Sequence, residues 1–489
     1  MDSDSRIPRP GRLSRRTVLK AGVAGLVYAG APVLRAAERS DVIVLGAGLA
    51  GLNAARQLEG LGFRVRVLEA NGSVGGRVQT NTIDGVVHEK GASDVGNLYA
   101  RVISTIRELD LELQPYAIAS RPFSYHIGGQ LLRGEEWESA DVNHTVGSER
   151  SIEPGRLEWE LFGQLNPLDN PVNWLQPEHL AIDVPMDAYL RSRGVSQAAI
   201  DLIAHTYNGE GIGRSSALPI FRDTSRQKMA TDAWLKRRET DPDVMRVAEI
   251  RGGMQRLPNA MAASLDGDVH LNHPAALVEQ DASGVTVTCR DGSRFRADKL
   301  VCAMSLPAMR NVDFRPGLSV AKQMAIASGE YYATTKFYLK PTSPFWEEDG
   351  YEPSLWSDGL IERIFARTDY SGEVHLLLVW INGAGARRMD KLSPEAAGQL
   401  VIDELARIRP ASKGRVEVVH HTAWGRDEFF GGCGFRYSAG QVGGLAQELP
   451  RAEGHIHFAG EHTRQIEVGM EAAMATGERA ALEIATASV

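Results

Sequence analysis

The chain has 489 residues, of which 43% are hydrophobic and 24% are charged, and its formal net charge at pH 7 is −8. This composition is typical of a globular protein, the length predicts more than one packed module, and the acidity argues against a nucleic-acid-binding protein. The three cysteines, Cys289, Cys302 and Cys433, cannot close a disulfide framework, so stability must come from a hydrophobic core.

Residues 1–38 have the pattern of an export signal and not of a folded segment. Residues 14–20 are basic and contain the pair Arg15-Arg16, and residues 21–31 are small and moderately apolar. Paired arginines favour the twin-arginine translocase as a transient partner and the periplasm as the destination. The apolar stretch is shorter than the roughly 20 residues of a membrane-spanning helix, so we expect no permanent membrane span. A disordered basic tail is the alternative interpretation.

The folded part opens on a strand, a glycine-rich turn, a helix and a second strand. The β-branched run 41–45 predicts a buried parallel strand, residues 49–61 a helix, and residues 63–69 the next strand. This unit predicts an α/β fold with a Rossmann-type, doubly wound sheet.

The turn between them has the spacing G-x-G-x-x-G, which suits the pyrophosphate of a dinucleotide at a helix N-terminus. Glu69 follows Gly51 by 18 residues, the right distance for a ribose hydroxyl partner. A purely structural glycine turn is the alternative. The candidate binding residues of this unit are Gly46, Gly48, Leu49, Ala50, Gly51, Glu69 and Ala70.

The rest of the chain alternates between two kinds of pattern. Residues of about 120–245 predict an inserted, mostly helical module, with helices at 185–193 and 197–207, and residues 320–420 are mixed. Strand patterns return at 269–271, 285–289, 299–303 and 455–461, Asp291-Gly292 predicts a hairpin turn, and a last helix extends through Ala487. We therefore expect a discontinuous cofactor domain, residues 39–120, 245–320 and 420–489, interleaved with an α+β substrate domain, residues 121–244 and 321–419.

Two further segments resemble the flavin amine oxidase family, which includes monoamine, polyamine and L-amino-acid oxidases. Residues 69–77, Glu-Ala-Asn-Gly-Ser-Val-Gly-Gly-Arg, match its extended fingerprint, and residues 458–463 and 469–481 match its closing motif. The resemblance covers nearly everything from Asp41 to Ala481. It implies that FAD, and not a diffusing nicotinamide, is the cofactor.

The resemblance also implies roles for individual residues. Gly76 and Arg77 would continue the pyrophosphate site, and Gly91, Ala92 and Ser93 would let the flavin ring approach the backbone. The remaining cofactor contacts would come from the adenine-side strand and the closing motif: Ala275, Gly460, Glu461 and Met470, the last through its N–H at the pyrimidine end of the flavin.

At the reacting end the resemblance implies catalytic roles for Lys336, Trp424 and Tyr437. Lys336 would hold a water near flavin N5, with Lys340 as a competitor for that role, and the segment from Trp424 to Tyr437 would form the aromatic wall. Cys433 stands in the Gly-Gly-Cys context through which some members attach flavin, and a buried thiol is the alternative.

Gly434 stands where the members with covalently attached flavin carry an aromatic residue. Two further departures from the family pattern concern the substrate. Gly469 stands where monoamine oxidases carry the second aromatic cage residue, and residues 93–96 lack the Met-Arg-x-Pro that gives L-amino-acid oxidases a carboxylate-binding arginine. Arg222 or Arg226 could replace that arginine.

The implied reaction is FAD-dependent oxidation of an amine C–N bond. Hydride would pass to flavin N5, the imine would hydrolyse to an aldehyde or ketone plus ammonia or amine, and O2 would reoxidise the flavin to give H2O2. No metal site, Ser-His-Asp set or P-loop lysine competes with this interpretation. The rivals are an L-amino-acid oxidase, a flavin desaturase of the porphyrinogen or carotenoid type, and a flavin-bearing partner protein without turnover.

Overall fold

Two large β-sheets organise the computed structural model, which describes residues 40–116, 118–119, 122–368 and 372–487. The expected export signal lies outside these residues. No helix in the described ranges is long and apolar enough to cross a membrane.

The first sheet contains the expected opening unit. β1 (Ser40–Leu45) leads through the glycine turn into α1 (Leu49–Gly60), and β2 (Val65–Leu68) returns parallel to β1. The core residues of β1, Val42 to Leu45, are almost fully buried because both faces of the strand are covered. The structure thus confirms the Rossmann-type start of the chain.

The strand order of this sheet is β11–β2–β1–β14–β13–β12–β15, and β23 pairs with β14. β14 is parallel to β1 and antiparallel to β13, and the expected hairpin turn joins β13 to β14, with Gly292 at φ +84°. The bounds of these strands are β11 (Val269–His270), β12 (Ala275–Asp281), β13 (Gly284–Cys289), β14 (Arg294–Cys302), β15 (Asp313–Arg315) and β23 (Ile456–Phe458).

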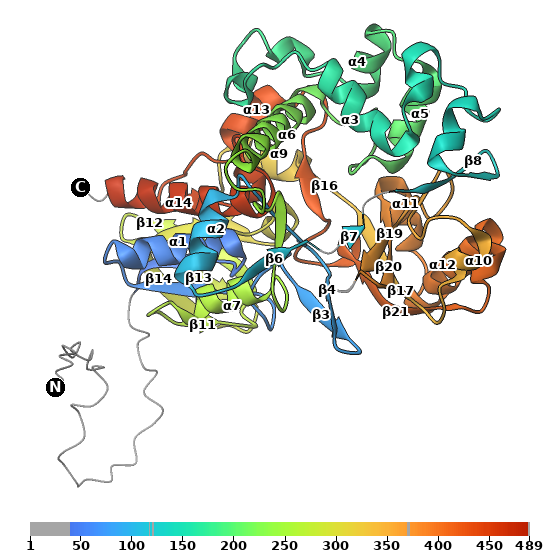
Figure 1. Ribbon diagram of the computed structural model, residues 1–489. Coiled ribbons are helices and arrows are strands. Elements are labelled where there is room, and N and C mark those ends of the chain that lie inside the picture. The colour runs from blue at the N-terminus through green and yellow to red at the C-terminus, as the bar shows by residue number, and fades with distance from the viewer. Residues whose placement is uncertain (1–39, 117, 120–121, 369–371, 488–489) are drawn as a thin grey trace, which may run out of the picture. The chain divides into compact units, whose positions relative to one another are not determined.

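The last helix, α14 (Gly469–Ala487), lies along α1 although more than 400 residues separate them in sequence (Figure 1). A Cβ on Gly477 would stand 2.1 Å from Ala50 O, so only glycine allows this approach of the two helices. Asn53 Nδ2 donates to Met474 O at 2.8 Å and fixes their register. Two further helices, α2 (Ala100–Glu108) and α7 (Arg256–Ala263), pack against this pair.

The second large sheet has the order β21–β17–β20–β19–β18–β8–β9, with β7 (Ile118–Ala119) on β19. Its apolar face packs against α10 (Phe345–Asp349), α11 (Gly383–Met389) and α12 (Pro394–Ile408). β21 crosses the domain boundary expected at residue 419; the domain limits otherwise stay a prediction. The strands are β8 (Ser124–Ile127), β9 (Gln130–Leu132), β17 (Thr334–Pro341), β18 (Leu355–Ser357), β19 (Arg363–Thr368), β20 (Val374–Asn382) and β21 (Val416–Ala423).

The segment expected to be mostly helical begins with a hairpin instead. Gly128 and Gly129, both at positive φ, turn β8 into β9, and these strands extend the second sheet. A Gly-Gly pair between two apolar runs is a hairpin signal that could have indicated this turn. The helical expectation is confirmed beyond it, with α3 (Pro154–Gln164), α4 (Met186–Ser192), α5 (Gln197–Thr206) and α6 (Ala217–Arg238).

Smaller sheets and helices connect these parts. β16 (Glu330–Tyr332) and β22 (Gly434–Arg436) form an antiparallel pair, in which Tyr332 lies opposite Gly434. The others are β3 (Thr80–Ile83), β4 (Val86–Glu89), β5 (Val95–Gly96), β6 (Leu113–Pro115), β10 (Val247–Ile250), α8 (Leu306–Met309), α9 (Val320–Ser328) and α13 (Val442–Glu448).

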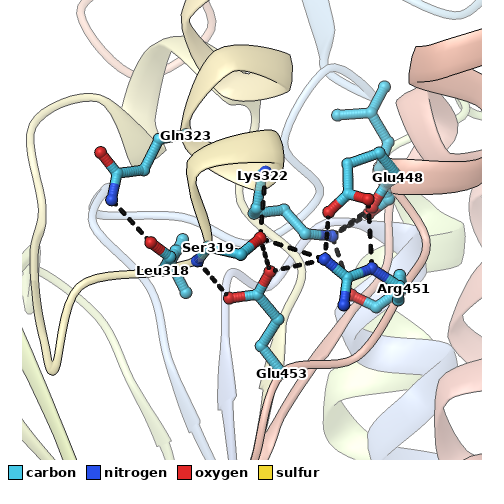
Figure 2. A network of polar contacts seen from close by, with 8 residues as sticks. Leu318, Ser319, Lys322, Gln323, Glu448, Arg451 and Glu453 are labelled. Carbon is cyan, nitrogen blue, oxygen red and sulfur yellow. Dashed lines mark hydrogen bonds and ion pairs between the residues drawn. The ribbon is translucent and has the colours of Figure 1, made fainter.

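A buried lysine fastens α9 to the end of α13 (Figure 2). Lys322 Nζ donates to the carbonyl oxygens of Glu448, Leu449 and Arg451 and lies 4.0 Å from the centre of the Phe458 ring. Its side chain is fully buried, and this burial lowers the pKa of Lys322 to about 8. The lysine therefore provides donors for carbonyls that the end of α13 leaves free.

We expect Lys322→Met to destabilise the protein by about 2–4 kcal/mol, because it leaves the carbonyl groups of Leu449 and Arg451 without this donor in a buried setting. The measurement is the unfolding midpoint of the purified protein. Lys391→Met, at an exposed position, is the matched control and should change stability by less than about 0.5 kcal/mol. Equal midpoints for the two variants would show that the three hydrogen bonds contribute nothing.

Candidate active site

A cavity of about 600 Å³ runs from the glycine turn after β1 to the strands of the second sheet. Nearly all of the residues singled out in the sequence lie on its wall, although they come from segments spread over the whole described chain. These are Gly46, Gly48, Leu49, Ala50, Glu69, Ala70, Gly76, Arg77, Gly91, Ala92, Ser93, Ala275, Lys336, Trp424, Gly460, Glu461 and Met470.

The glycine turn forms one end of the cavity. No side chain caps the N-terminus of α1 at Gly48, and a Cβ there would meet only open space. The first N–H groups of the helix therefore remain available to an anion, and the helix dipole favours one. Gly51 lies beneath the turn and not on the wall, since its Cβ would stand 1.9 Å from Gly46 O.

Two charged side chains flank the free N–H groups at the start of α1. Glu69 ends β2, and its carboxylate accepts hydrogen bonds from the N–H groups of Ala47 at 2.7 Å and Asn71 at 2.8 Å. Arg77 donates to Cys433 O at 2.7 Å and lies 3.7 Å from the Glu461 carboxylate. Glu69 thus places an acceptor, and Arg77 a cation, on the wall of the same cavity.

Lys336 forms the other end. Its Nζ donates to Gly91 O at 3.1 Å and stands 4.1 Å from the centre of the Trp380 ring, while the side chain is 1% exposed. Burial lowers the pKa of Lys336. Trp424 closes the wall nearby, with Nε1 donating to Lys90 O at 3.0 Å. This end of the cavity is therefore partly aromatic, and it holds one buried, positioned donor.

Lys340, the competitor, is excluded from this end of the cavity. It is partly exposed near the end of β17, where it pairs with Asp84. It does not line the cavity.

This cavity fits FAD. Its volume lies in the range of about 300–1,000 Å³ that is usual for ligand pockets. The free N–H groups at the start of α1 suit a pyrophosphate, and Glu69 suits a ribose. Gly91 lies on the wall near Lys336, and it packs so closely against Arg77 O and Trp424 that a Cβ would stand 1.8 Å and 3.1 Å from them. The described residues contain no group of three or more His, Cys, Asp or Glu side chains that could hold a metal ion.

A family model described as flavin-containing amine oxidoreductase matches residues 49–485. The chain belongs to this family. It is an oxidoreductase that uses FAD to oxidise amines, as its fingerprint and closing motif had indicated.

Curated relatives are L-amino-acid oxidases at low identity. One from Bothrops moojeni is 26% identical over 476 residues, covering 91% of this chain and 89% of the relative. One from Siganus canaliculatus is 27% identical over 469 residues, covering 91% and 85%.

Similar solved structures include a putrescine oxidase redesigned at its cofactor site, with a TM-score of 0.75, 24% identity, and coverage of 92% of this chain and 99% of the other. A cyclohexylamine oxidase from Brevibacterium oxydans has a TM-score of 0.75 and 23% identity and covers 92% of this chain. These structures show the shared fold.

Within this flavin-dependent enzyme, Tyr437 lies elsewhere than expected. It lines a second cavity of about 120 Å³, and its ring packs 4.7 Å from that of Phe435. Side chains alternate along an extended segment, so Tyr437 shares the face of Phe435, whereas Gly434 and Arg436 face the large cavity. Tyr437 therefore does not belong to the wall at the reacting end.

Several wall residues were missed from the sequence. Trp380 is the register partner of Lys336 across β17 and β20, and Tyr332 lies opposite Gly434. The period-two alternation around Gly434 could have indicated Arg436. The other missed residues of the large cavity include Asp94, Tyr99, Asn208, Phe429, Phe430 and Arg464.

The two arginines considered for a carboxylate site do not line the cavity. Arg222 is fully buried, donates to Gln465 O at 3.0 Å and stacks on Trp174. Arg226 donates to Leu98 O at 3.3 Å and stacks on Tyr99. Cys433 does line the cavity, so it is not a core thiol.

Proposed function

We propose that the protein oxidises the C–N bond of a small amine in the chamber of Lys336, Trp380 and Trp424, with O2 as the electron acceptor. The placement of Lys336 carries this proposal. A buried lysine with one backbone acceptor and an aromatic ring beside it is costly unless its donor serves a ligand or water in the cavity.

In this reaction the amine loses two electrons and two protons to give an imine, and water converts the imine to an aldehyde or ketone plus ammonia or amine. O2 takes up the two electrons and two protons as H2O2. FAD, when bound, supplies the hydride acceptor and passes the electrons to O2.

The chain's own residues prepare the site for this chemistry. The rings of Trp380 and Trp424 exclude water and favour a cationic or electron-poor group beside them. Lys336 holds a fixed donor where negative charge develops on oxygen, and the rigid backbone at Gly91 keeps that donor in place.

An α-amino acid is a second candidate substrate, because Arg436 has capacity for a carboxylate. Arg436 is half-buried, lines both cavities and stacks 5.0 Å from the centre of the Tyr332 ring. Its hydrogen bond goes to Phe435 O at 3.3 Å, and within the described chain it forms no ion pair. A guanidinium with free donors binds a carboxylate in a bidentate manner.

Anaerobic titration of the yellow protein with benzylamine, cyclohexylamine, putrescine, L-leucine and L-phenylalanine tests both candidates. We expect an amine without a carboxylate to bleach the visible absorbance of bound FAD, and Arg436→Leu to leave that reaction within about threefold of wild type. Bleaching by the amino acids alone, lost in Arg436→Leu, would establish the second candidate instead. Bleaching by none would refute both.

We also propose that the protein is exported folded to the periplasm through the twin-arginine route. The support is the sequence of residues 14–31, with its arginine pair ahead of a short apolar stretch. Replacing Arg15 and Arg16 by lysine should keep the protein in the cytoplasm, measured by cell fractionation. Arg12→Lys, outside the pair, is the control and should be exported; export of the double variant at the wild-type level would contradict the assignment.

A further inference from the structure

The glycine at position 434 leaves a space that a tyrosine from another strand fills. Gly434 and Tyr332 are direct cross-strand partners in the β16–β22 pair. A Cβ on Gly434 would stand 2.9 Å from Cε1 and 3.2 Å from Oη of Tyr332. Directly opposite side chains share one face of a sheet. The Tyr332 ring therefore covers the position that a side chain at 434 would occupy, and it lines the large cavity there.

A second tyrosine stands in the same relation to Gly469. Tyr99 immediately precedes α2, and a Cβ on Gly469, at the start of α14, would stand 2.9 Å from Tyr99 Oη. Tyr99 also lines the large cavity. Gly469 has a second reason to be glycine, its φ of +57°, whereas Gly434 has no such backbone requirement.

An arginine lies over each ring. Arg436 lies 5.0 Å from the centre of the Tyr332 ring, and Arg226 lies 5.8 Å from that of Tyr99. Tyr332 ends β16 and Lys336 lies in β17, and both line the large cavity.

We propose that Tyr332 and Tyr99 are specificity-determining residues, which form the aromatic wall against which the amine lies, and that Gly434 and Gly469 are glycine to admit these rings. This inference rests on the proposed function, because it assigns the wall of the same site. The inference predicts that each glycine and its tyrosine depend on each other. A larger residue at the glycine position displaces the tyrosine ring, and removal of the ring leaves space for a larger side chain at the glycine position. Each such pair is called a unit below.

A double-substitution cycle on the FAD-loaded protein tests the Gly434–Tyr332 unit. The variants are Gly434→Ala, Gly434→Phe, Tyr332→Ala and the double variant Gly434→Phe with Tyr332→Ala. Gly444→Ala in α13, whose Cβ would have no neighbour within 4 Å, is the matched control. FAD content and unfolding midpoint are measured for each variant, so that a folding defect is recognised.

We expect each single substitution to lower kcat/KM for the best amine of the titration about tenfold or more, and the control to match wild type. In the double variant an aromatic ring projects from β22 instead of β16. Its kcat/KM should recover to within about threefold of wild type. The inference would be overturned if the loss of kcat/KM in the double variant equalled the product of the losses in its two single variants, Gly434→Phe and Tyr332→Ala. It would also be overturned if Gly434→Ala kept the kcat/KM of wild type.

Crystal structures of the holoenzyme separate this inference from the proposed function. If wild type oxidises no amine, the proposed function fails, and the structure of Gly434→Ala still tests the unit. A Tyr332 ring displaced from the added Cβ supports the Gly434–Tyr332 relation; a ring in its wild-type place overturns it.

Discussion

Lys336→Met should reoxidise its reduced FAD about 10²–10³-fold more slowly than wild type, while reduction by the amine changes far less. The reason is electrostatic. Oxygen passes through an anionic state, and the donor on Lys336 is buried beside Trp380, where solvent screens its field weakly. Hydride transfer from carbon creates no comparable anion beside this residue. Stopped-flow mixing of the reduced protein with O2 measures the first rate, and anaerobic mixing with amine measures the second.

Lys340→Met is the matched control, four residues along the same strand. Lys340 is partly exposed, pairs with Asp84 and does not line the cavity, so its loss should leave both rates within about twofold of wild type. A slow reaction with O2 in Lys340→Met and a fast one in Lys336→Met would show that the wrong lysine was chosen. Equal rates in all three proteins would point to an acceptor other than O2.

We expect Gly51→Ala to fold but to bind less FAD than wild type after purification, by a factor of about ten or more. The added Cβ would stand 1.9 Å from Gly46 O and 3.1 Å from a methyl group of Val44. Because a backbone carbonyl cannot rotate away cheaply, α1 must shift from the turn. The N–H groups at its start then lose their alignment with the pyrophosphate.

The measurement is the ratio of flavin to protein absorbance after purification, with circular dichroism to confirm folding. Gly60→Ala is the matched control, since Gly60 ends the same helix and its Cβ would have no neighbour within 4 Å. It should carry the wild-type amount of FAD. Full FAD retention by Gly51→Ala would show that pyrophosphate binding does not depend on the close approach of α1 to the turn.

The sequence alone was sufficient for features that depend on a few neighbouring residues. The G-x-G-x-x-G turn, the helix after it and the carboxylate at the end of β2 each follow from local backbone requirements, and the structure brings Gly48 and Glu69 to one cavity. For these features spacing along the chain already determines geometry. Gly91 was expected on the wall from the family resemblance, but its close contact with Arg77 O was visible only in the structure.

Other features depended on how distant segments pair, and only the tertiary structure decided them. Lys336 and Lys340 are an even number of residues apart in β17, so the alternation of side chains does not distinguish them. Lys336 pairs with strands on both sides, whereas Lys340 pairs only with β21. Only Lys336 therefore lies in the interior of the sheet. Trp380 meets Lys336 through strand register, and Tyr332 fills the space at Gly434 across β16 and β22. Register and packing join residues far apart in sequence, and no local pattern encodes them. The sequence therefore determined the cofactor and the reaction class, while the tertiary structure decided which side chains face the substrate.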